Sequence, residues 1–408
     1  MNRVWKQYLE DAMRQKLSLA LLLLVFVLGA INYFRPVPDL EASAAFPTST
    51  TIAGTPPAFP WPSRGSSAVG VSGLGLMAMS GTDLPMPMAS VAKVMTALVI
   101  LEDRPFEVGQ LGPSILITDA DVQAYEADKA DQQSVVKVQA GERLTEFQAL
   151  EALLIPSGNN IASTLARWDA GSLDAFVAKM NQRAQTLGLA HTNFADPAGA
   201  SPKTVSTPSD LLALGMAAMK LSVFAVIVNS AQANLPVAGA VYNVNYVLGQ
   251  SGIIGIKTGS GLNAGANFLF AAAATIDGHD ITLFGCVMGQ PTLDHAFNAA
   301  KALIATMKSG LRVGRVVTKN EVVGRYDPAW GGGADIISTE DVELIGWPGM
   351  ALRRTLFART LVIQKDLPPG TRAGTLQIVL GDYKVDVTVV TAAPLFPPTR
   401  FWRLTRIG

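Results

Sequence analysis

The sequence predicts an α/β fold of the α+β type, in which one mixed sheet is backed by helices and carries a helical lobe, followed by a small β-domain. Two observations carry this prediction. Strand-like segments stand at both ends of a helix-rich stretch, at residues 67–81 and 253–289. From Val313 to Ala393 the pattern changes to short β-rich runs with glycine and proline turns, which is typical of a separate β-domain.

The N-terminal segment is predicted to be a membrane anchor. Residues 17–34 contain no charged side chain, and this length is just enough for a helix to cross a bilayer. Basic residues precede the segment, whereas Arg35 is the only one that follows it before Arg64, so the positive-inside bias places residues 1–16 in the cytoplasm. We therefore expect a single-pass cell-membrane protein whose other domains lie on the extracytoplasmic side.

A cleaved signal peptide is the alternative for this segment. The charged head is long for a signal peptide, and the one small-x-small site, at residues 42–44, lies well beyond the apolar run, so we favour the uncleaved anchor. Residues 35–65 are rich in proline, serine, threonine and alanine. Because this composition offers little that could form a core, we expect a semi-extended tether between the anchor and the folded domains.

The elements of the main domain, residues 66–310, follow from caps, periodicity and turn residues. Thr145 and Gln148 form a capping-box pair, and Pro156 ends the helix that they begin. These signals predict helices at 89–101, 146–155, 160–168, 207–220 and 293–308, a hairpin at 67–81, and strands at 253–259, 266–276 and 281–289. Residues 311–408 are assigned to the β-rich C-terminal domain.

Three short motifs stand in one order along the main domain: Ser90-Val91-Ala92-Lys93, Ser157-Gly158-Asn159 and Lys257-Thr258-Gly259. Together they are the signature of a serine acyl-transfer enzyme that uses lysine as its base. The first motif lies on a predicted helix, where residues three apart share a face, so the Lys93 ammonium can reach the Ser90 hydroxyl. We expect the second motif in a turn between helices and the third on a sheet strand.

A second Ser-x-x-Lys sequence, from Ser134 to Lys137, lies in the β-rich segment 133–139, which we interpret as a strand. On a strand, positions i and i+3 project to opposite faces, so this serine and this lysine are not expected to meet. We therefore assign the nucleophile to Ser90, at a helix start where the dipole favours negative charge. Lys93 can act as its base if burial and a neighbouring cation such as Lys257 lower its pKa toward neutrality.

Over residues 66–310 the chain resembles the low-molecular-mass penicillin-binding D-alanyl-D-alanine carboxypeptidases. The resemblance rests on the phrases ASVAKVMTAL, IPSGNNIA, GIKTGS, FADPAGA and TPSDLLAL, which extend well beyond the bare motifs. It implies a β-lactamase/transpeptidase-like sheet, an acyl-enzyme on Ser90, and removal of the terminal D-alanine from peptidoglycan stem peptides. β-Lactams are then covalent inhibitors. Residues 311–408 look like the β-rich C-terminal domain of many members, though with far less specificity.

The resemblance also implies how protons and charge are handled. Ser157 relays the proton to the departing D-alanine nitrogen, and Asn159 holds Lys93 and the substrate amide. The oxyanion hole is formed by the backbone N–H groups of Ser90 and Ser260.

The third motif has an implied role in binding. Lys257 and Thr258 bind the terminal carboxylate of the peptide, as a point charge and a hydroxyl donor. Gly259 leaves space for a substrate that lies against the strand edge.

Two alternative functions stay open. A serine β-lactamase-like hydrolase shares all three motifs, but the class A enzymes need a glutamate to activate the deacylating water, and no glutamate occurs between Glu151 and Lys257. The other alternative is a non-catalytic membrane-anchored wall-binding protein of the same fold. The intact Ser90 and Lys93 argue against it.

Composition and motif content exclude other classes. Lysine plus arginine and aspartate plus glutamate number 32 each, and no long basic run occurs, so nothing supports nucleic-acid binding. The three histidines are scattered and no Gly-x-Ser-x-Gly elbow exists, which argues against a Ser-His-Asp hydrolase. No Cys/His/Asp cluster indicates a metal, and we expect no cofactor. Cys286 is expected to be buried in a strand, and residues 401–406 to pack against the β-domain without forming a helix stable in water.

Overall fold

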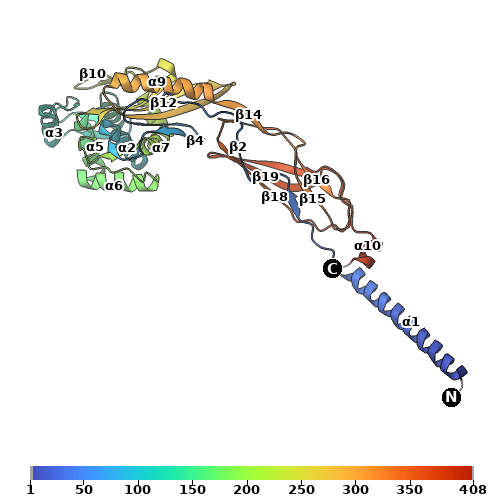
Figure 1. The fold of residues 1–408 in the computed structure, drawn as a ribbon. Coiled ribbons are helices and arrows are strands. Elements are labelled where there is room, and N and C mark those ends of the chain that lie inside the picture. The colour runs from blue at the N-terminus through green and yellow to red at the C-terminus, as the bar shows by residue number, and fades with distance from the viewer. Residues whose placement is uncertain (1–2, 407–408) are drawn as a thin grey trace. The chain divides into compact units, whose positions relative to one another are not determined.

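The computed structural model describes residues 3–406 and divides them into two compact units (Figure 1). The first unit combines both ends of the chain: the segment up to Thr50, Gly314–Leu344, and the segment from Ala351 onward. The second unit comprises Thr51–Val313 and Ile345–Met350. Helices and strands are mixed in the second unit, as the predicted fold class requires.

A five-stranded sheet forms the centre of the second unit, in the order β11-β12-β13-β3-β4, and all its pairs are antiparallel, whereas a mixed sheet was predicted. Its strands are β3 (Ser66–Val71), β4 (Gly75–Ser80), β11 (Ile253–Gly261), β12 (Gly265–Ile276) and β13 (His279–Gln290). Asp277 and Gly278 join β12 to β13 with positive φ angles of 49° and 86°, as in a tight hairpin turn. The predicted hairpin and the three predicted strands are confirmed, and β13 carries Cys286, which is buried.

Two helices cover opposite faces of this sheet, α7 (Pro208–Ala218) and α9 (Leu293–Gly310). On β12 the neighbouring residues Phe268 and Leu269 project to opposite sides. Phe268 makes an edge-to-face contact with Phe297 of α9, with ring centroids 4.8 Å apart, whereas Leu269 lies beside Gly215 of α7. Figure 1 shows α9 above the sheet and α7 below it.

The helical lobe is built around α2, whose residues from Lys93 to Leu101 are all buried. Its helices are α2 (Lys93–Asp103), α3 (Asp119–Ala130), α4 (Glu146–Leu154), α5 (Asn159–Ala170), α6 (Leu173–Thr186) and α8 (Ser222–Val228). The predicted capping box is present at α4, where the Thr145 hydroxyl accepts a hydrogen bond from the Gln148 N–H at 3.2 Å. Shorter elements of this unit are η1 (Ala89–Ala92), η2 (Gln250–Gly252), β5 (Met86–Pro87), β6 (Ser114–Leu116), β7 (Arg143–Thr145), β8 (Val205–Ser206), β9 (Gln232–Leu235) and β10 (Gly239–Tyr242).

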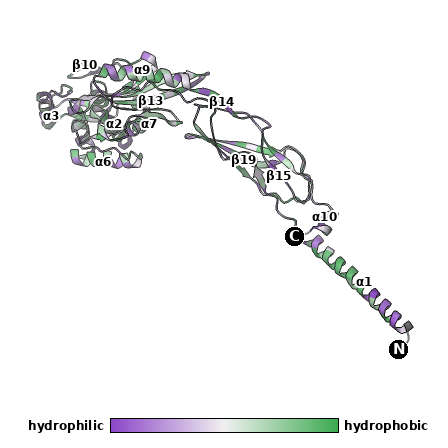
Figure 2. Cartoon of the chain, in the orientation of Figure 1, coloured by the Kyte–Doolittle hydropathy of each residue, from purple (hydrophilic) through white to green (hydrophobic). Residues whose placement is uncertain are grey.

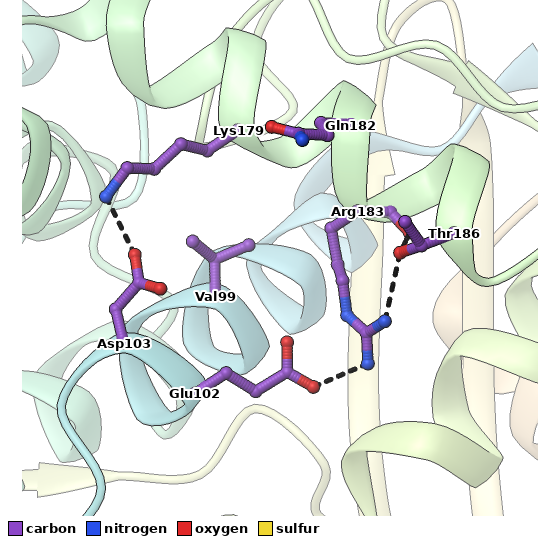
Figure 3. Close-up of a pocket in the computed structure, with 7 residues that line it drawn as sticks. All are labelled: Val99, Glu102, Asp103, Lys179, Gln182, Arg183 and Thr186. Carbon is purple, nitrogen blue, oxygen red and sulfur yellow. Dashed lines mark hydrogen bonds and ion pairs between the residues drawn. The ribbon is translucent and has the colours of Figure 1, made fainter.

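Ion pairs connect the C-terminal end of α2 to α6 (Figure 3). Lys179 pairs with Asp103 at 2.7 Å, and Arg183 pairs with Glu102 at 2.6 Å. All four side chains are partly exposed, and such pairs contribute only about 0 to 1 kcal/mol each. The buried apolar surface of α2 is therefore the main force that holds the lobe together.

A seven-stranded sheet forms the first unit, in the order β1-β15-β16-β20-β19-β18-β2. Its strands beyond residue 311 are β15 (Val322–Tyr326), β16 (Ala334–Ser338), β18 (Ala351–Ala358), β19 (Arg372–Leu380) and β20 (Tyr383–Thr391), and the chain has two further short strands, β14 (Arg312–Val317) and β17 (Val342–Gly346). Along β19 the side chains of Leu376, Ile378 and Leu380 are buried at alternate positions, which is the pattern of a strand with one face on a core.

The segment 35–65 differs from the expected tether. β1 (Ala42–Ala44) pairs with β15 at one edge of the seven-stranded sheet, and β2 (Ser49–Thr51) occupies the other edge. Leu40 is buried and forms a bridge with Leu361. Small polar side chains offer little to a core, but an edge strand needs only backbone N–H and C=O groups to pair, and composition does not report these.

The long N-terminal helix is α1 (Arg3–Phe34). An apolar window within Trp5–Phe34 has a mean hydropathy of 2.4 and no buried residue, and Figure 2 shows the apolar middle of this helix. Its length and composition are those of a helix that can cross a membrane. α7 and α8 are long and apolar enough for a membrane span only when taken together, but they are bent by 112° and both contribute to the core of the second unit.

Residues 401–405 are helical, although a helix was not expected here. They lie in α10 (Arg400–Thr405), which packs against the C-terminal end of α1. The Arg406 guanidinium donates to the backbone carbonyl of Asn32 at 2.7 Å, so it partners one of the carbonyl groups that a helix end leaves free. The Trp402 ring also makes an edge-to-face contact with the Trp330 ring of the β-rich region. These tertiary contacts stabilise a helix that is too short to be stable alone.

Candidate active site

The first motif lies where η1 passes into α2. A 3₁₀ helix has three residues per turn, so residues i and i+3 stand directly above one another. Lys93 is accordingly placed over Ser90, and its Nζ atom donates to Ser90 Oγ at 2.7 Å. Ala89, which precedes the serine, has a φ of 49°, a left-handed conformation that is strained for alanine. The structure thus brings the expected serine and lysine together at a sharp turn.

Lys93 is completely buried and has two further acceptors besides Ser90. Its Nζ atom donates to Asn159 Oδ1 at 2.6 Å and to the Ala198 carbonyl at 3.0 Å. Burial, followed by the nearby charge of Lys257, lowers the pKa of Lys93 well below its usual value. A neutral lysine is therefore accessible, and it can accept the proton of the Ser90 hydroxyl.

The second motif forms a tight turn between α4 and α5, as expected. Ser157 has a φ of 69°, and a side chain at Gly158 would meet Val136 Cγ2 at 2.9 Å and the Ala152 carbonyl at 3.0 Å. Asn159 begins α5 and reaches Lys93, whereas the buried Ser157 hydroxyl has no hydrogen-bond partner among residues 3–406. The structure therefore brings Asn159 into the lysine network and leaves Ser157 with an unused hydroxyl.

The third motif lies on β11, with Lys257 and Thr258 almost fully buried. Lys257 Nζ donates to the Thr258 carbonyl at 3.1 Å. Burial lowers the pKa of Lys257 to about 7. An anionic group bound beside it would restore its charge, because a neighbouring negative charge favours the protonated form.

Gly259 has a structural role in addition to the expected one. A side chain at this position would lie 2.7 Å from the Met88 carbonyl and 3.1 Å from the Ser90 backbone nitrogen. The glycine is required because β11 passes directly against η1, and not only because a substrate needs space. Ser260, the next residue, is exposed.

Ser90, Asn159 and Ser260 open into one cleft with a volume of about 540 Å³. Polar loops form its walls, from residues 131–134, 199–202 and 260–264. Lys93, Ser157, Lys257 and Thr258 are buried close to this surface without lining the cleft. Among residues 3–406, no group of three His, Cys, Asp or Glu side chains is arranged to hold a metal ion.

Asp196 is a site residue that the sequence analysis missed. Its carboxylate accepts hydrogen bonds from the backbone N–H groups of Ala198 at 2.9 Å, Gly199 at 2.6 Å and Ser201 at 2.9 Å. These bonds fix the loop in which the Ala198 carbonyl faces Lys93. The Asp-Pro-Ala-Gly sequence is a turn signature and could have indicated the loop.

The segment 133–139 was also misinterpreted, because it is not a strand in the structure. The Asn160 side chain holds it instead, accepting from the Val136 N–H at 3.0 Å and donating to the Val136 carbonyl at 2.9 Å. Ser134 lines the cleft, and Gln133 accepts a hydrogen bond from Asn159 Nδ2. No local pattern in the sequence reports these contacts, because they join residues 24 to 26 positions apart.

The bonded Ser90–Lys93 pair and the antiparallel sheet with its helical lobe define a protein of the β-lactamase/transpeptidase fold, which confirms the predicted fold. The family described as D-alanyl-D-alanine carboxypeptidase, peptidase family S11, matches residues 75–292, more than half of the chain. The chain belongs to this family.

Relatives and solved structures agree with this assignment. The chain is 36% identical over 194 residues to D-alanyl-D-alanine carboxypeptidase DacB2 of Mycobacterium tuberculosis, covering 46% of this chain and 62% of the relative's length. It is 32% identical over 200 residues to the D-alanyl-D-alanine carboxypeptidase of Streptomyces sp. strain K15, covering 45% of this chain and 67% of that protein. The crystal structure of the Streptomyces K15 DD-transpeptidase matches 63% of this chain and 98% of its own, with 27% identity and a TM-score of 0.52.

A fourth comparison concerns the fold alone. The carboxypeptidase DacD of Francisella tularensis has 18% identity and a TM-score of 0.61, over 85% of this chain and 97% of its own. This likeness extends the structural match beyond the part of the chain that the family covers.

Proposed function

We propose that the protein is a serine-type D-alanyl-D-alanine carboxypeptidase that removes the terminal D-alanine from peptidoglycan stem peptides and is acylated by β-lactams. The observation that carries the proposal is the buried Lys93 at 2.7 Å from the Ser90 hydroxyl, beside a cleft that a peptide can enter. Membership of the carboxypeptidase family supports the substrate class.

Acylation begins with neutral Lys93. As Ser90 Oγ attacks the carbonyl carbon of the penultimate D-alanine, the hydroxyl proton passes to Lys93 Nζ. The carbonyl oxygen becomes an oxyanion, which the backbone N–H groups of Ser90 and Ser260 stabilise. Ser90 and Ser260 both line the cleft, which supports this assignment.

The leaving group then needs a proton. The carbon–nitrogen bond breaks, and the nitrogen of the departing D-alanine takes a proton that Lys93 supplies through the Ser157 hydroxyl. That hydroxyl has no hydrogen-bond partner in the described part of the chain, Lys93 included, so it is available to both Lys93 and the substrate nitrogen once the substrate is bound. Lys257 and the Thr258 hydroxyl bind the terminal carboxylate, whose charge compensates the buried ammonium. Free D-alanine and an ester on Ser90 result, and water hydrolyses the ester.

The β-lactamase alternative can be separated by the fate of the acyl-enzyme. An opened β-lactam keeps its leaving group attached and can obstruct the attacking water, and no glutamate lines the cleft in the described residues to drive that water. We therefore expect intact-protein mass spectrometry to show a long-lived penicillin adduct on Ser90, while peptide turns over. An adduct that clears as fast as peptide is hydrolysed would favour a β-lactamase.

The non-catalytic alternative has less support. Burying a lysine costs free energy, and wall binding alone requires neither Lys93 nor its bond to Ser90. The decisive experiment is mass spectrometry of a pentapeptide ending in D-Ala-D-Ala after incubation with the protein. We expect loss of one D-alanine with the wild type and none with Ser90→Ala. The proposal would be contradicted if the wild-type protein left the peptide intact and formed no penicillin adduct.

We also propose that α1 anchors the protein as a single-pass helix in the cell membrane, with residues 1–16 in the cytoplasm and the catalytic unit on the extracytoplasmic side. The apolar window within Trp5–Phe34 and the basic residues before it support this orientation. The substrate class agrees with it, because peptidoglycan lies outside the cell membrane. Protease protection of intact spheroplasts tests it, since only the C-terminal side of α1 should be cleaved.

A further inference from the structure

Gln133 contacts the lysine network from a segment that none of the three motifs includes. Asn159 joins it to Lys93, since Asn159 Oδ1 accepts from Lys93 Nζ at 2.6 Å while Asn159 Nδ2 donates to Gln133 Oε1. The position of Gln133 is fixed on both sides. Its backbone N–H donates to the Asp128 carbonyl at 2.9 Å, and the next carbonyl, of Ser134, accepts from the Asn159 N–H at 2.8 Å.

An asparagine amide can turn by about 180° and exchange its oxygen and nitrogen at little steric cost. Only one of the two orientations offers an acceptor to Lys93. In the other, the N–H groups of Asn159 would face the N–H groups of the lysine, which has no acceptor function when protonated. A group that accepts from Nδ2 on the far side selects the productive orientation, and Gln133 Oε1 is that acceptor.

We propose that Gln133 is a positioning residue for acylation, which holds the Asn159 amide with its oxygen toward Lys93. This inference rests on the proposed function of the Ser90–Lys93 pair. Gln133 acts through Asn159 and not on the reacting atoms. It thereby keeps Lys93 Nζ directed at the serine hydroxyl.

The charged groups that face Lys93 determine how a change at Gln133 is detected. Lys257 disfavours the protonated lysine, whereas Asp196 and Asp128 favour it. A carboxylate in place of the Gln133 amide keeps the acceptor and adds a negative charge, which favours protonated Lys93 as the Asp128 charge does. The maximal acylation rate and its pH dependence therefore report two separate consequences of substitution.

The test measures the second-order rate of Ser90 acylation by a fluorescent penicillin between pH 5 and 9, using the full chain in detergent. For Gln133→Leu we expect the maximal rate to fall about tenfold, the usual effect of losing one hydrogen bond to a charged or catalytic group. For Gln133→Glu we expect a maximal rate close to wild type, with the acidic limb moved to higher pH, because the added charge favours protonated Lys93. Gln139→Leu and Gln139→Glu, exposed positions on the same segment, are the matched controls and should change nothing.

Double variants separate positioning from a general structural effect. If Gln133 acts through Asn159, Gln133→Leu should cause no further loss in the Asn159→Leu background. Three outcomes would each overturn the inference. Gln133→Leu could show the wild-type rate and pH profile, or Gln133→Glu could be as slow as Gln133→Leu. The third is that Gln133→Leu still causes a tenfold loss in the Asn159→Leu background. If the wild type itself is not acylated, the proposed function fails, and this result is distinct from the others.

Discussion

Lys93 lies among three hydrogen-bond acceptors, and its chemistry depends on whether it carries a proton. The protonated amine can satisfy all three acceptors, whereas the neutral amine has a lone pair that can accept from Ser90. A buried lysine in contact with a hydroxyl is therefore a base only as long as it can lose its proton. Arginine, which remains charged at all relevant pH values, tests this requirement.

We expect Lys93→Arg to lose Ser90 acylation nearly as completely as Lys93→Ala, by a factor of about 100 to 10,000, the usual contribution of a general base. Covalent labelling by fluorescent penicillin measures the loss. Lys137→Arg, in the other Ser-x-x-Lys sequence, serves as the control, since Lys137 is exposed. An arginine variant that labels at the wild-type rate would mean that the base lies elsewhere.

Two lysines with opposite requirements shape the pH dependence. In the proposed mechanism acylation needs neutral Lys93, so kcat/KM should rise with pH through the lowered pKa of Lys93. The same mechanism needs charged Lys257 to bind the carboxylate, so kcat/KM should fall as pH rises through about 7. The expected profile is bell-shaped, and Lys257→Arg should move its alkaline limb to higher pH because arginine keeps its charge. An unchanged alkaline limb in a folded, active Lys257→Arg variant would contradict this assignment.

At the scale of elements, α4 begins with a carboxylate that has no partner. Both oxygens of Glu146 are buried without a hydrogen bond among residues 3–406. A helix N-terminus favours negative charge, by about 0.3 to 1 kcal/mol, but burial outweighs this effect and raises the pKa of Glu146 to about 7. The ordinary pKa of a glutamate is 4.5, so the unfolded chain loses the Glu146 proton above this pH, whereas the folded state keeps the proton until about pH 7.

This difference makes the stability of the lobe depend on pH. The native state binds more protons between pH 4.5 and 7, so Glu146 lowers the free energy of unfolding as pH rises through this window, by about 1 to 3 kcal/mol after allowance for solvent screening. We expect Glu146→Gln to be more stable than wild type at pH 8 and similar to it at pH 4.5, as measured by chemical denaturation. Glu107→Gln, at an exposed position, is the control. Equal stabilities at pH 8 would show that the carboxylate is not destabilising.

The elements also show how far the sequence could be interpreted. The α4 capping box and the β12–β13 turn are local signals, and the structure has both where they were predicted. The proximity of Ser90 and Lys93 is equally local, because one helical turn determines it. Gln133 was missed because its role depends on a contact between distant segments. The turn that Asp196 holds is local, but the bond that joins this turn to Lys93 spans 105 positions, and the sequence does not report it. The strands of residues 42–51 were missed because edge pairing uses the backbone, which leaves no compositional pattern.

At the scale of the whole molecule, the discontinuous first unit determines where the chain can be shortened. A chain that begins at Val37 lacks α1 but retains β1 and β2, so we expect it to be soluble and to react with penicillin at the wild-type rate. A chain that begins at Ser66 lacks both edge strands, and its seven-stranded sheet should unfold at a lower temperature. Differential scanning calorimetry of the two proteins measures the difference. Identical thermograms would show that β1 and β2 contribute nothing to the first unit.

The same discontinuity determines when the strands of the first unit can pair during synthesis. The ribosome delivers β1 and β2 early, but their neighbours β15 and β18 lie more than 270 residues further along the chain. At about 5 to 20 residues per second, these strands wait for roughly 15 to 60 s before they can pair. The second unit is complete in sequence, apart from a short segment, before that time. Nascent chains are thus exposed to mispairing at residues 42–51 for longer than at any catalytic motif, and the serine and threonine content of this segment keeps it soluble during the delay.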